Sequence, residues 1–323
     1  MKKSFCTSQK QSLNDFLKIE LTKIPELSNK EVSNSKIRRL IVAGCVCVNG
    51  RVVTRPGFEL RGKSFIDCDM DLEKFFFEKQ PDDIDFTLTE KNVLFEDEYI
   101  ICVNKPAFLP VEQTIVGNRK NLHDCVVDYL WKKNPSLRNP PYVGIMHRLD
   151  RETSGVILFT KQRTVNKSVF EQFEKHTITK TYIAVVCGEP KKKTFTVENY
   201  IGRVSSKSQA AKWGSLPESR GGLYAKTSFV CLPLQRNNLK NASLSSMKNN
   251  CELCIVNCKL YTGRTHQIRV HLSESGYPLL GDTLYGGRNY SRIMLHSDKL
   301  IFKHPVSGEE ITVTCDFSDL KKI

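Results

Sequence analysis

The sequence predicts an α+β protein in which a small α/β domain precedes a larger domain with a mixed or antiparallel central sheet. In the larger part, short β-rich runs outnumber helical patterns, and the helices fall irregularly between them, which argues against repeated βαβ units. Near the N-terminus, an amphipathic basic helix runs directly into a tight hairpin signal. The length of 323 residues fits about two domains.

The first domain is predicted from two helical patterns and one turn. Residues 11–24 have apolar side chains near helical spacing, and residues 36–42 have an apolar face with cations largely off it. Those cations are Lys36, Arg38 and Arg39. Asn49-Gly50 stands between two β-rich runs, the strongest short hairpin signal, and Arg51 begins the second run. A solvated helix face beside an unrelated hairpin remains the alternative.

The second domain is predicted as a series of strands with a few helices. The expected strands are 93–95, 99–103, 155–159 and 182–186, and the expected helices are 122–131 and a segment around 169–173. Residues 235–250 are rich in Asn, Ser and Lys, which predicts a mobile loop. We expect a first domain over residues 11–70, an acidic linker over 71–91 and a second domain over 92–316.

The composition favours a reduced protein with a polyanionic partner. The net charge is +14, and no run approaches the roughly 20 apolar residues of a membrane helix. Polar residues follow the N-terminus in place of an apolar signal core, so we expect a cytoplasmic protein. Cys251, Cys254 and Cys258 have a metal-like spacing but continue as a strand pattern without a second ligand pair, so we expect no metal.

The segment His147–Gly155 is the most informative for chemistry. Asp150 stands between Arg148 and Arg151, whose charges are expected to keep its carboxylate ionised, and a fixed carboxylate can act as nucleophile or base. A salt-bridged turn is the alternative. Residues 261–272, interpreted as a strand, put Gln267, Arg269 and His271 on one face. Such a face fits phosphate, a base edge or a carboxylate, and an exposed polar face is its alternative.

These two segments resemble the RluA family of pseudouridine synthases. The pattern H-R-L-D-x-x-T-S-G is followed by G-R-T-H-Q-I-R-V-H-L, and other matching segments occur in the family's order. They are Val103–Pro106, Lys180–Ala184, Leu280–Gly287 and Leu295–Pro305. The N-terminal helix and hairpin resemble the S-four module, a small RNA-binding domain that the RluC and RluD branch carries before the same catalytic domain.

The resemblance implies a role for each matching residue. Asp150 is the expected catalytic aspartate, Tyr182 the aromatic that stacks on the target uracil, and Arg269 the partner that holds Asp150. Arg148 is expected to enter the space that the flipped base leaves. The other expected RNA-binding residues are Arg264, His266 and His271, with Arg38, Arg39 and Arg51 in the N-terminal module.

The implied reaction converts uridine in RNA to pseudouridine without cofactor or metal. The bond from C1′ to N1 breaks, the base rotates, and C5 joins C1′. Attack at C1′, attack at C6 and initial proton removal remain open as first steps. Because the target base must leave the stack, an arginine plug and an aromatic platform fit the task. Large-subunit ribosomal RNA is the first expected substrate and transfer RNA the second, with no DNA or membrane partner and a monomeric enzyme.

One segment departs from the family pattern, and two other functions compete with the implied one. Where the RluC and RluD branch usually has Val-His-Pro-Gly, this chain has Val111-Glu112-Gln113-Thr114, an acidic residue near the expected RNA channel. The first rival is a non-catalytic RNA-binding or ribosome-assembly protein, which predicts loss of the expected catalytic residues. The second is a hydrolase that pairs Glu152 with Asp150, although Glu152 falls on a variable position of the signature.

Overall fold

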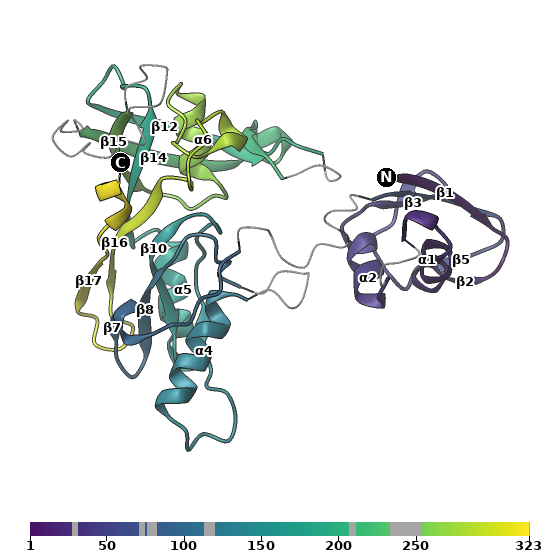
Figure 1. Cartoon of the computed structure of the whole chain (residues 1–323), viewed down its shortest axis with the longest axis horizontal. Coiled ribbons are helices and arrows are strands. Elements are labelled where there is room, and N and C mark those ends of the chain that lie inside the picture. Colours follow the sequence, from purple (N-terminus) through teal and green to yellow (C-terminus); the bar gives the residue numbers. More distant parts are fainter. Residues whose placement is uncertain are drawn as a thin grey trace. The chain divides into compact units, whose positions relative to one another are not determined.

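A computed structural model describes residues 1–27, 32–70, 75, 83–112, 120–206, 211–232 and 253–322. The chain divides into two compact units, the first formed mainly by residues 1–81 and the second mainly by 82–203 and 213–323 (Figure 1). The loop expected over 235–250 lies outside the described residues, as does Cys251. No helix in the described part of the chain is long and apolar enough to cross a membrane.

The first unit packs two helices and a small sheet around one apolar core. Its elements are β1 (Lys2–Thr7), β2 (Gln11–Ser12), α1 (Leu13–Thr22), η1 (Pro25–Leu27), α2 (Asn34–Val42), β3 (Val46–Val48), β4 (Arg51–Val52), β5 (Glu59–Leu60) and β6 (Ser64–Asp69). Four strands form a sheet in the order β1-β6-β3-β4. Both predicted helices are confirmed, and strand β1, which precedes the expected start of the domain at residue 11, adds to the sheet.

The predicted hairpin of the first unit is confirmed, and its turn follows from Asn49-Gly50. Strands β3 and β4 pair in antiparallel register, with Val48 opposite Arg51. Asn49 has φ +49° and Gly50 φ +76°, the left-handed conformations that such a turn requires. The Asn49 side chain also accepts a 2.9 Å hydrogen bond from the N–H of Phe65, which ties the turn to β6.

The second unit is built on one large mixed sheet. Its elements are η2 (Glu90–Asn92), β7 (Val93–Glu96), β8 (Ile100–Lys105), α4 (Leu122–Lys133), β9 (Gly144–Ile145), β10 (Ser154–Thr160), η3 (Arg163–Val165), α5 (Asn166–Glu174), β11 (Thr179–Cys187), β12 (Thr194–Arg203), β13 (Trp213–Ser215), η4 (Glu218–Arg220), β14 (Leu223–Leu232), β15 (Leu253–Leu260), α6 (Gln267–Glu274), η6 (Thr283–Tyr285), β16 (Leu295–Lys303), β17 (Glu310–Thr314) and η7 (Ser318–Lys322).

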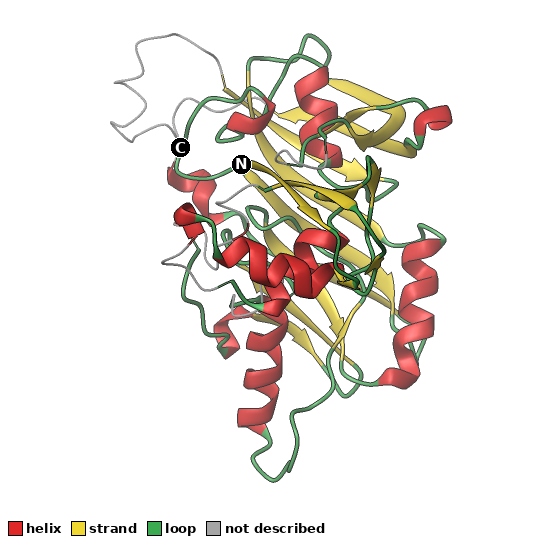
Figure 2. Ribbon diagram, turned by 90° about the vertical axis from the view of Figure 1, so that its right-hand side faces the viewer, coloured by secondary structure: helices red, strands yellow, loops and turns green. Residues whose placement is uncertain are grey.

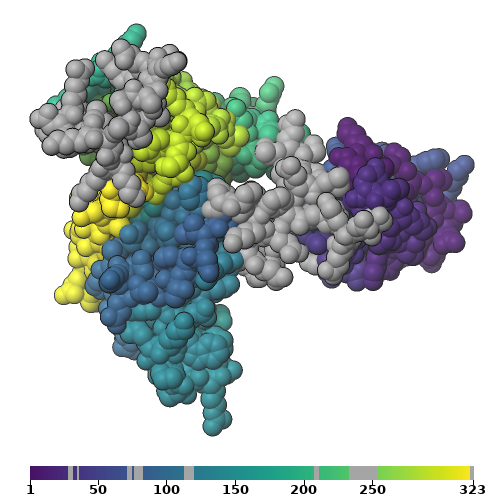
Figure 3. Space-filling model, viewed as in Figure 1, coloured from purple at the N-terminus to yellow at the C-terminus, as the bar shows by residue number. Residues whose placement is uncertain are grey.

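Eleven strands among the described residues form this sheet, and they run as a continuous twisted surface in Figure 2. The main order is β13-β12-β14-β15-β11-β16-β10-β8-β7, with β17 paired to β16 and β9 to β10. The pair β10–β16 is parallel, whereas the other ladders are antiparallel, so the predicted mixed sheet is confirmed. In the space-filling view, the yellow C-terminal strand β17 lies against the blue β7 (Figure 3).

The middle of the sheet, at β10, is buried on both faces because helices pack on each of them. Strand β10 is buried at every position, as its apolar run predicts. Its side chains alternate, so that Ile157 packs into the core shared with α4 and α6, whereas Leu158 packs into the core shared with α5. Cys254 and Cys258 of β15 are buried strand residues that pack in the first of these cores.

The strand interpretation of residues 261–272 is wrong, because the second half of this segment, from Gln267 on, belongs to helix α6. Ile268, Val270 and Leu272 alternate as strand residues do, but Ile268 and Leu272 are also one helical turn apart, and both pack in the main core. The Gln267 side chain accepts the backbone N–H of Arg264 at 2.9 Å and thereby closes the turn that starts the helix.

Candidate active site

Asp150 lies in the loop between β9 and β10, and its carboxylate faces two residues at the start of α6. Its side chain is 25% exposed. Nη1 of Arg269 is 3.6 Å from Oδ2 of Asp150, and Nε2 of His266 is 3.9 Å from the same oxygen. The two segments that the sequence singled out therefore meet here. Asp150 is partly open to solvent on one side and is held by charge on the other.

Arg269 is fixed by a second carboxylate that the sequence analysis missed. Its Nε and Nη2 donate to the two carboxylate oxygens of Asp282 at 2.7 and 2.9 Å, and both side chains are almost completely buried. Such a bidentate pair fixes the plane of the guanidinium group. Asp282 belongs to the segment Leu280–Gly287, which carried the family resemblance but received no individual role.

The arginines beside Asp150 in sequence are held by other carboxylates. Arg148 donates to Glu112, and Arg151 donates from Nε to Asp83 at 2.7 Å and from Nη1 to Glu152 at 2.8 Å. The arginine beside the Asp150 carboxylate is therefore Arg269, in place of the expected Arg148 and Arg151. Glu152, the partner in the hydrolase reading, is engaged with Arg151.

The backbone of the Asp150 loop is fixed by a close approach of two strands. Ser154 and Gly155 at the start of β10 pair with His296 and Ser297 of β16. Gly155 has φ +109°, and a Cβ at this position would stand 2.2 Å from the carbonyl oxygen of Ser297. Only glycine fits there without a shift of backbone, which explains the glycine that follows Thr-Ser in the signature.

Lys105 supports the same loop through a hydrogen bond to the carbonyl of Arg151, and its role was not predicted. It is fully buried at the end of β8. Its ammonium group donates to the carbonyl oxygens of Pro106, Leu109 and Arg151 at 2.7–2.9 Å. Burial lowers the pKa of Lys105 to about 7, while the three carbonyl oxygens match the three N–H donors of the charged form.

Tyr182 lies on β11, near the site, and is mostly buried. Burial is the main cause that raises its pKa; a hydrogen bond with Ser297 acts the other way, and the charge of Asp150 adds a smaller increase. The phenol is therefore neutral at physiological pH. Its role as the platform for the target uracil stays a prediction.

His266 and Arg264 lie at the turn before α6. His266 has φ +56°, a left-handed conformation that is costly for a residue with a side chain, and such strain concentrates at functional sites. Its Nδ1 is 2.9 Å from the hydroxyl of Tyr285, and burial lowers its pKa. Arg264 donates from Nε to the carbonyl of Tyr224 at 2.9 Å.

His271 occupies a different place from the one its motif suggested. It is fully buried, with Nδ1 2.9 Å from the hydroxyl of Thr227 and Nε2 2.8 Å from Oδ1 of Asn199. Burial lowers its pKa to about 4. This position gives His271 a part in joining α6 to the sheet and argues against a direct RNA contact.

The predicted RNA-binding residues of the first unit lie on α2 and the hairpin. Arg38 and Arg51 are exposed, and Arg39 is partly exposed. Ser33 caps helix α2, because its side chain accepts the N–H of Lys36, and this cap determines where the helix that carries Arg38 and Arg39 begins.

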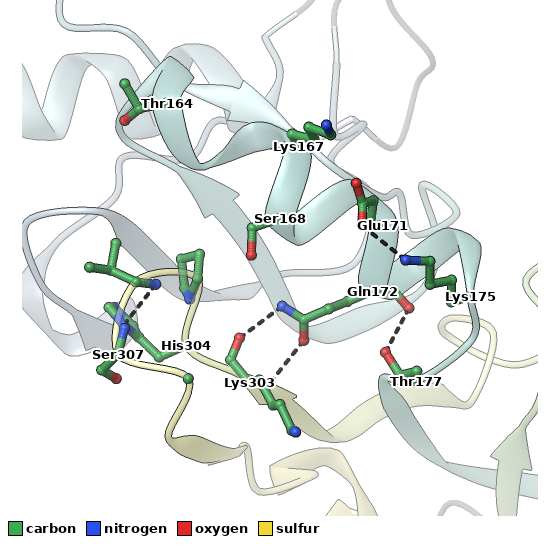
Figure 4. Close-up of a pocket in the computed structure, with 13 residues that line it drawn as sticks. Thr164, Lys167, Ser168, Glu171, Gln172, Lys175, Thr177, Lys303, His304 and Ser307 are labelled. Atoms are coloured by element: carbon green, nitrogen blue, oxygen red, sulfur yellow. Dashed lines mark hydrogen bonds and ion pairs between the residues drawn. The ribbon is translucent and has the colours of Figure 1, made fainter.

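A groove on the second unit does not include the predicted site residues. It lies between α5 and the turn after β16, where Gln172 bonds both the N–H and the carbonyl of Lys303 at 2.9 Å (Figure 4). His304, at its rim, is 2.7 Å from Asp97. These bonds give the groove a structural explanation as the join between α5 and β16.

A partly exposed aspartate beside a buried arginine, on a mixed sheet, fits the site of an enzyme that uses one carboxylate. A family profile described as RNA pseudouridylate synthase matches residues 99–274, more than half of the chain. The chain therefore belongs to the RNA pseudouridylate synthase family, and it is an RNA pseudouridine synthase. A profile for the S4 domain matches residues 28–66.

Named relatives cover most of the chain. A protein of Zymomonas mobilis named ribosomal large subunit pseudouridine synthase D is 30% identical, over 87% of this chain and 84% of its own length. A protein of Vibrio cholerae with the same name is 29% identical, over 87% and 82%. The solved structure named Human RNA Pseudouridylate Synthase Domain Containing 1 has a TM-score of 0.54 at 24% identity, covering 70% of this chain and 82% of its own, and this likeness supports the fold.

Proposed function

We propose that this enzyme isomerises uridine in large-subunit ribosomal RNA, with Asp150 as its catalytic carboxylate. One observation carries the assignment of Asp150: its carboxylate is 25% exposed, while the guanidinium 3.6 Å away is buried and fixed by Asp282. A reacting group must be both accessible and held in place, and Asp150 meets both requirements. The names of the relatives from Zymomonas mobilis and Vibrio cholerae support ribosomal RNA as the substrate.

The remaining residues support the same reaction. The glycosidic bond from C1′ to N1 breaks, C5 forms the new bond to C1′, C5 loses its hydrogen, and N1 gains one, so the atoms balance without an added reactant. Arg148 is exposed and is held by an exposed ion pair, which a nucleic acid can displace at small cost. It therefore suits insertion into the stack, and Tyr182 suits contact with the flipped base.

The first unit contributes affinity in this proposal. We assign RNA binding to residues 11–70, a linker role to 71–91 and catalysis to 92–316. The exposed cations Arg38 on α2 and Arg51 on the hairpin fit the sequence-independent attraction of phosphate groups. The proposal also includes a monomeric, cytoplasmic enzyme that takes RNA and not DNA and needs no cofactor, and sedimentation and activity with a chelator present test two of these points.

The substrate is tested with RNA from cells that lack this enzyme, labelled with tritium at C5 of uridine and separated into large-subunit ribosomal and transfer RNA. We expect tritium release from the ribosomal fraction. Release from transfer RNA alone would show that transfer RNA is the substrate and would leave the proposed reaction unchanged. No release from either fraction, with RNA binding intact, would favour the non-catalytic assembly factor.

A further inference from the structure

Three residues from separate parts of the second unit line up behind the carboxylate of Asp150. The hydroxyl of Tyr285 in η6 accepts the backbone N–H of Trp213 at 2.9 Å. The same hydroxyl is 2.9 Å from Nδ1 of His266, and Nε2 on the other side of that ring is 3.9 Å from Oδ2 of Asp150. The rings of His266 and Tyr285 meet edge to face at 87°, with 5.6 Å between their centroids.

The proton on His266 is decided by what each ring nitrogen faces. Nε2 faces a carboxylate, which accepts hydrogen bonds when ionised and repels a lone pair, so the N–H belongs at Nε2. Nδ1 is then the acceptor, and the Tyr285 hydroxyl donates to it. This assignment satisfies Nδ1 and the Tyr285 hydroxyl and points the Nε2–H of His266 toward Oδ2 of Asp150, 3.9 Å away.

Burial keeps the His266 ring neutral although three carboxylates lie near it. Asp150, Asp282 and Glu152 favour its protonated form, whereas burial and the guanidinium of Arg269 oppose it. Burial is the largest of these effects, and the pKa of His266 is lowered. A neutral N–H donor adds direction to the cationic contact from Arg269.

We infer that His266, set by Tyr285, is a positioning residue for the pseudouridine synthase reaction, which orients the carboxylate of Asp150 through its Nε2–H. This inference rests on the proposed role of Asp150. The backbone at His266 is strained, with φ +56°. Such strain fits a residue whose side chain must point in one direction for the function of the site. Neither His266 nor Tyr285 needs to touch RNA for this task.

The test compares variants that keep or remove the relevant hydrogen-bonding group. His266→Gln retains an N–H donor at similar reach, His266→Leu removes it, and Tyr285→Phe removes only the hydroxyl. We expect the single-turnover rate to fall about 10- to 100-fold in His266→Leu and Tyr285→Phe, the scale of a misplaced reacting group, with RNA affinity within about twofold of wild type. We expect His266→Gln to recover most of the rate.

Two control variants separate positioning from folding. Tyr277→Phe removes a hydroxyl that also accepts a backbone N–H, from Lys191, and His304→Gln alters another histidine beside an aspartate. We expect both controls to keep the wild-type rate. A wild-type rate in His266→Leu, or equal losses in His266→Gln and His266→Leu, would overturn the inference.

A spectroscopic measurement keeps this inference separate from the proposed function. The ¹⁵N shifts of the His266 ring report which nitrogen carries the proton in the free enzyme, whether or not a substrate is in hand. We expect the Nε2–H form in wild type and a mixture in Tyr285→Phe. The Nδ1–H form in wild type would reject the positioning role, whereas absence of tritium release by wild type would reject the proposed function.

Discussion

Arg269 donates two hydrogen bonds to Asp282, at 2.7 and 2.9 Å, and turns its third nitrogen toward Asp150. The two carboxylates thus share one guanidinium, but only Asp282 is buried. Asp282 fixes Arg269 and leaves Asp150 accessible. The division of tasks between a buried carboxylate and a partly exposed one is the basis of the first prediction.

Asp282→Asn is expected to lower both stability and rate. The change keeps the shape of the side chain but leaves the charge of Arg269 buried without its bidentate partner, a loss of about 3–5 kcal/mol in the free energy of unfolding. We expect the single-turnover rate to fall at least about 10-fold at temperatures where the variant is folded. Urea unfolding and tritium release measure the two effects, and a variant as stable as wild type would contradict the account.

Gly155→Ala is expected to be far more harmful than alanine at an open glycine. Its Cβ would meet the carbonyl of Ser297 at 2.2 Å, so the strand pair β10–β16 must shift, at a cost of about 3 kcal/mol. Gly308 also has a positive φ, +75°, but open space around it, so Gly308→Ala is a matched control that costs about 1 kcal/mol. Thermal melts compare the two, and equal losses would show that the close approach is unimportant.

The second unit is expected to lose stability in acid through the buried His271 and His296 and the partly buried His147. Burial lowers the pKa of His147 to about 3 and those of His271 and His296 to about 4, from 6.5. Between these values the unfolded chain binds more protons than the folded one. The three histidines therefore do not reduce the free energy of unfolding above pH 6.5, and they reduce it progressively as the pH drops toward 4.

His147→Gln tests this pH dependence at one site. Nε2 of His147 accepts the N–H of Leu158 at 3.0 Å, and the amide oxygen of Gln can accept the same bond without titrating. We expect urea unfolding of the variant to depend less on pH between 6.5 and 4.5. A pH dependence identical to that of wild type would remove His147 from the explanation.

Glu112→Gln is expected to tighten RNA binding. Glu112 holds Arg148 in the free enzyme and leaves a negative charge close to the expected path of the RNA. Because the pair is exposed, its removal changes stability little, but it frees Arg148 and removes repulsion from phosphate. We expect Kd to fall about two- to fivefold at low salt. Glu309→Gln, an exposed change of the same charge, is the control, and equal effects would show only a change in net charge.

Arg38→Ala and Arg51→Ala are expected to weaken RNA binding with a reduced salt dependence. Each arginine is exposed on the first unit. A residue that contacts one phosphate contributes about one unit to the slope of log K against log salt. Filter binding over a salt series measures the slope, with Lys18→Ala on α1 as a control. Unchanged slopes in both arginine variants would move the RNA-binding surface elsewhere.

The sequence predicts the elements whose causes are local. Asn49-Gly50 determines its own turn, and the uninterrupted apolar run of 155–159 predicts a strand buried on both faces. The segment at 261–272 fails this test because its alternation of Ile268, Val270 and Leu272 also satisfies a helix. The turn at Gln267 decides between the two, and no periodicity detects it.

The sequence indicates the pair at the centre of the site but misses Asp282 and Lys105 and most of the contacts. The resemblance brings Asp150 and Arg269 together, and the structure has them 3.6 Å apart. The choice of Asp282 as the second partner of Arg269 depends on how distant segments pack. So does the attachment of Arg148 to Glu112, which sequence proximity to Asp150 does not indicate.

Tritium release by Asp150→Asn tests the central claim most directly. Uridine C5 loses its hydrogen only when it becomes the new glycosidic carbon, and the substitution removes the charge of Asp150 while keeping its shape. With large-subunit ribosomal RNA that lacks the modification, we expect release by wild type and none by the variant, at equal RNA binding. Equal release by the two proteins would contradict the account, because the reaction would then proceed without the carboxylate on which it rests.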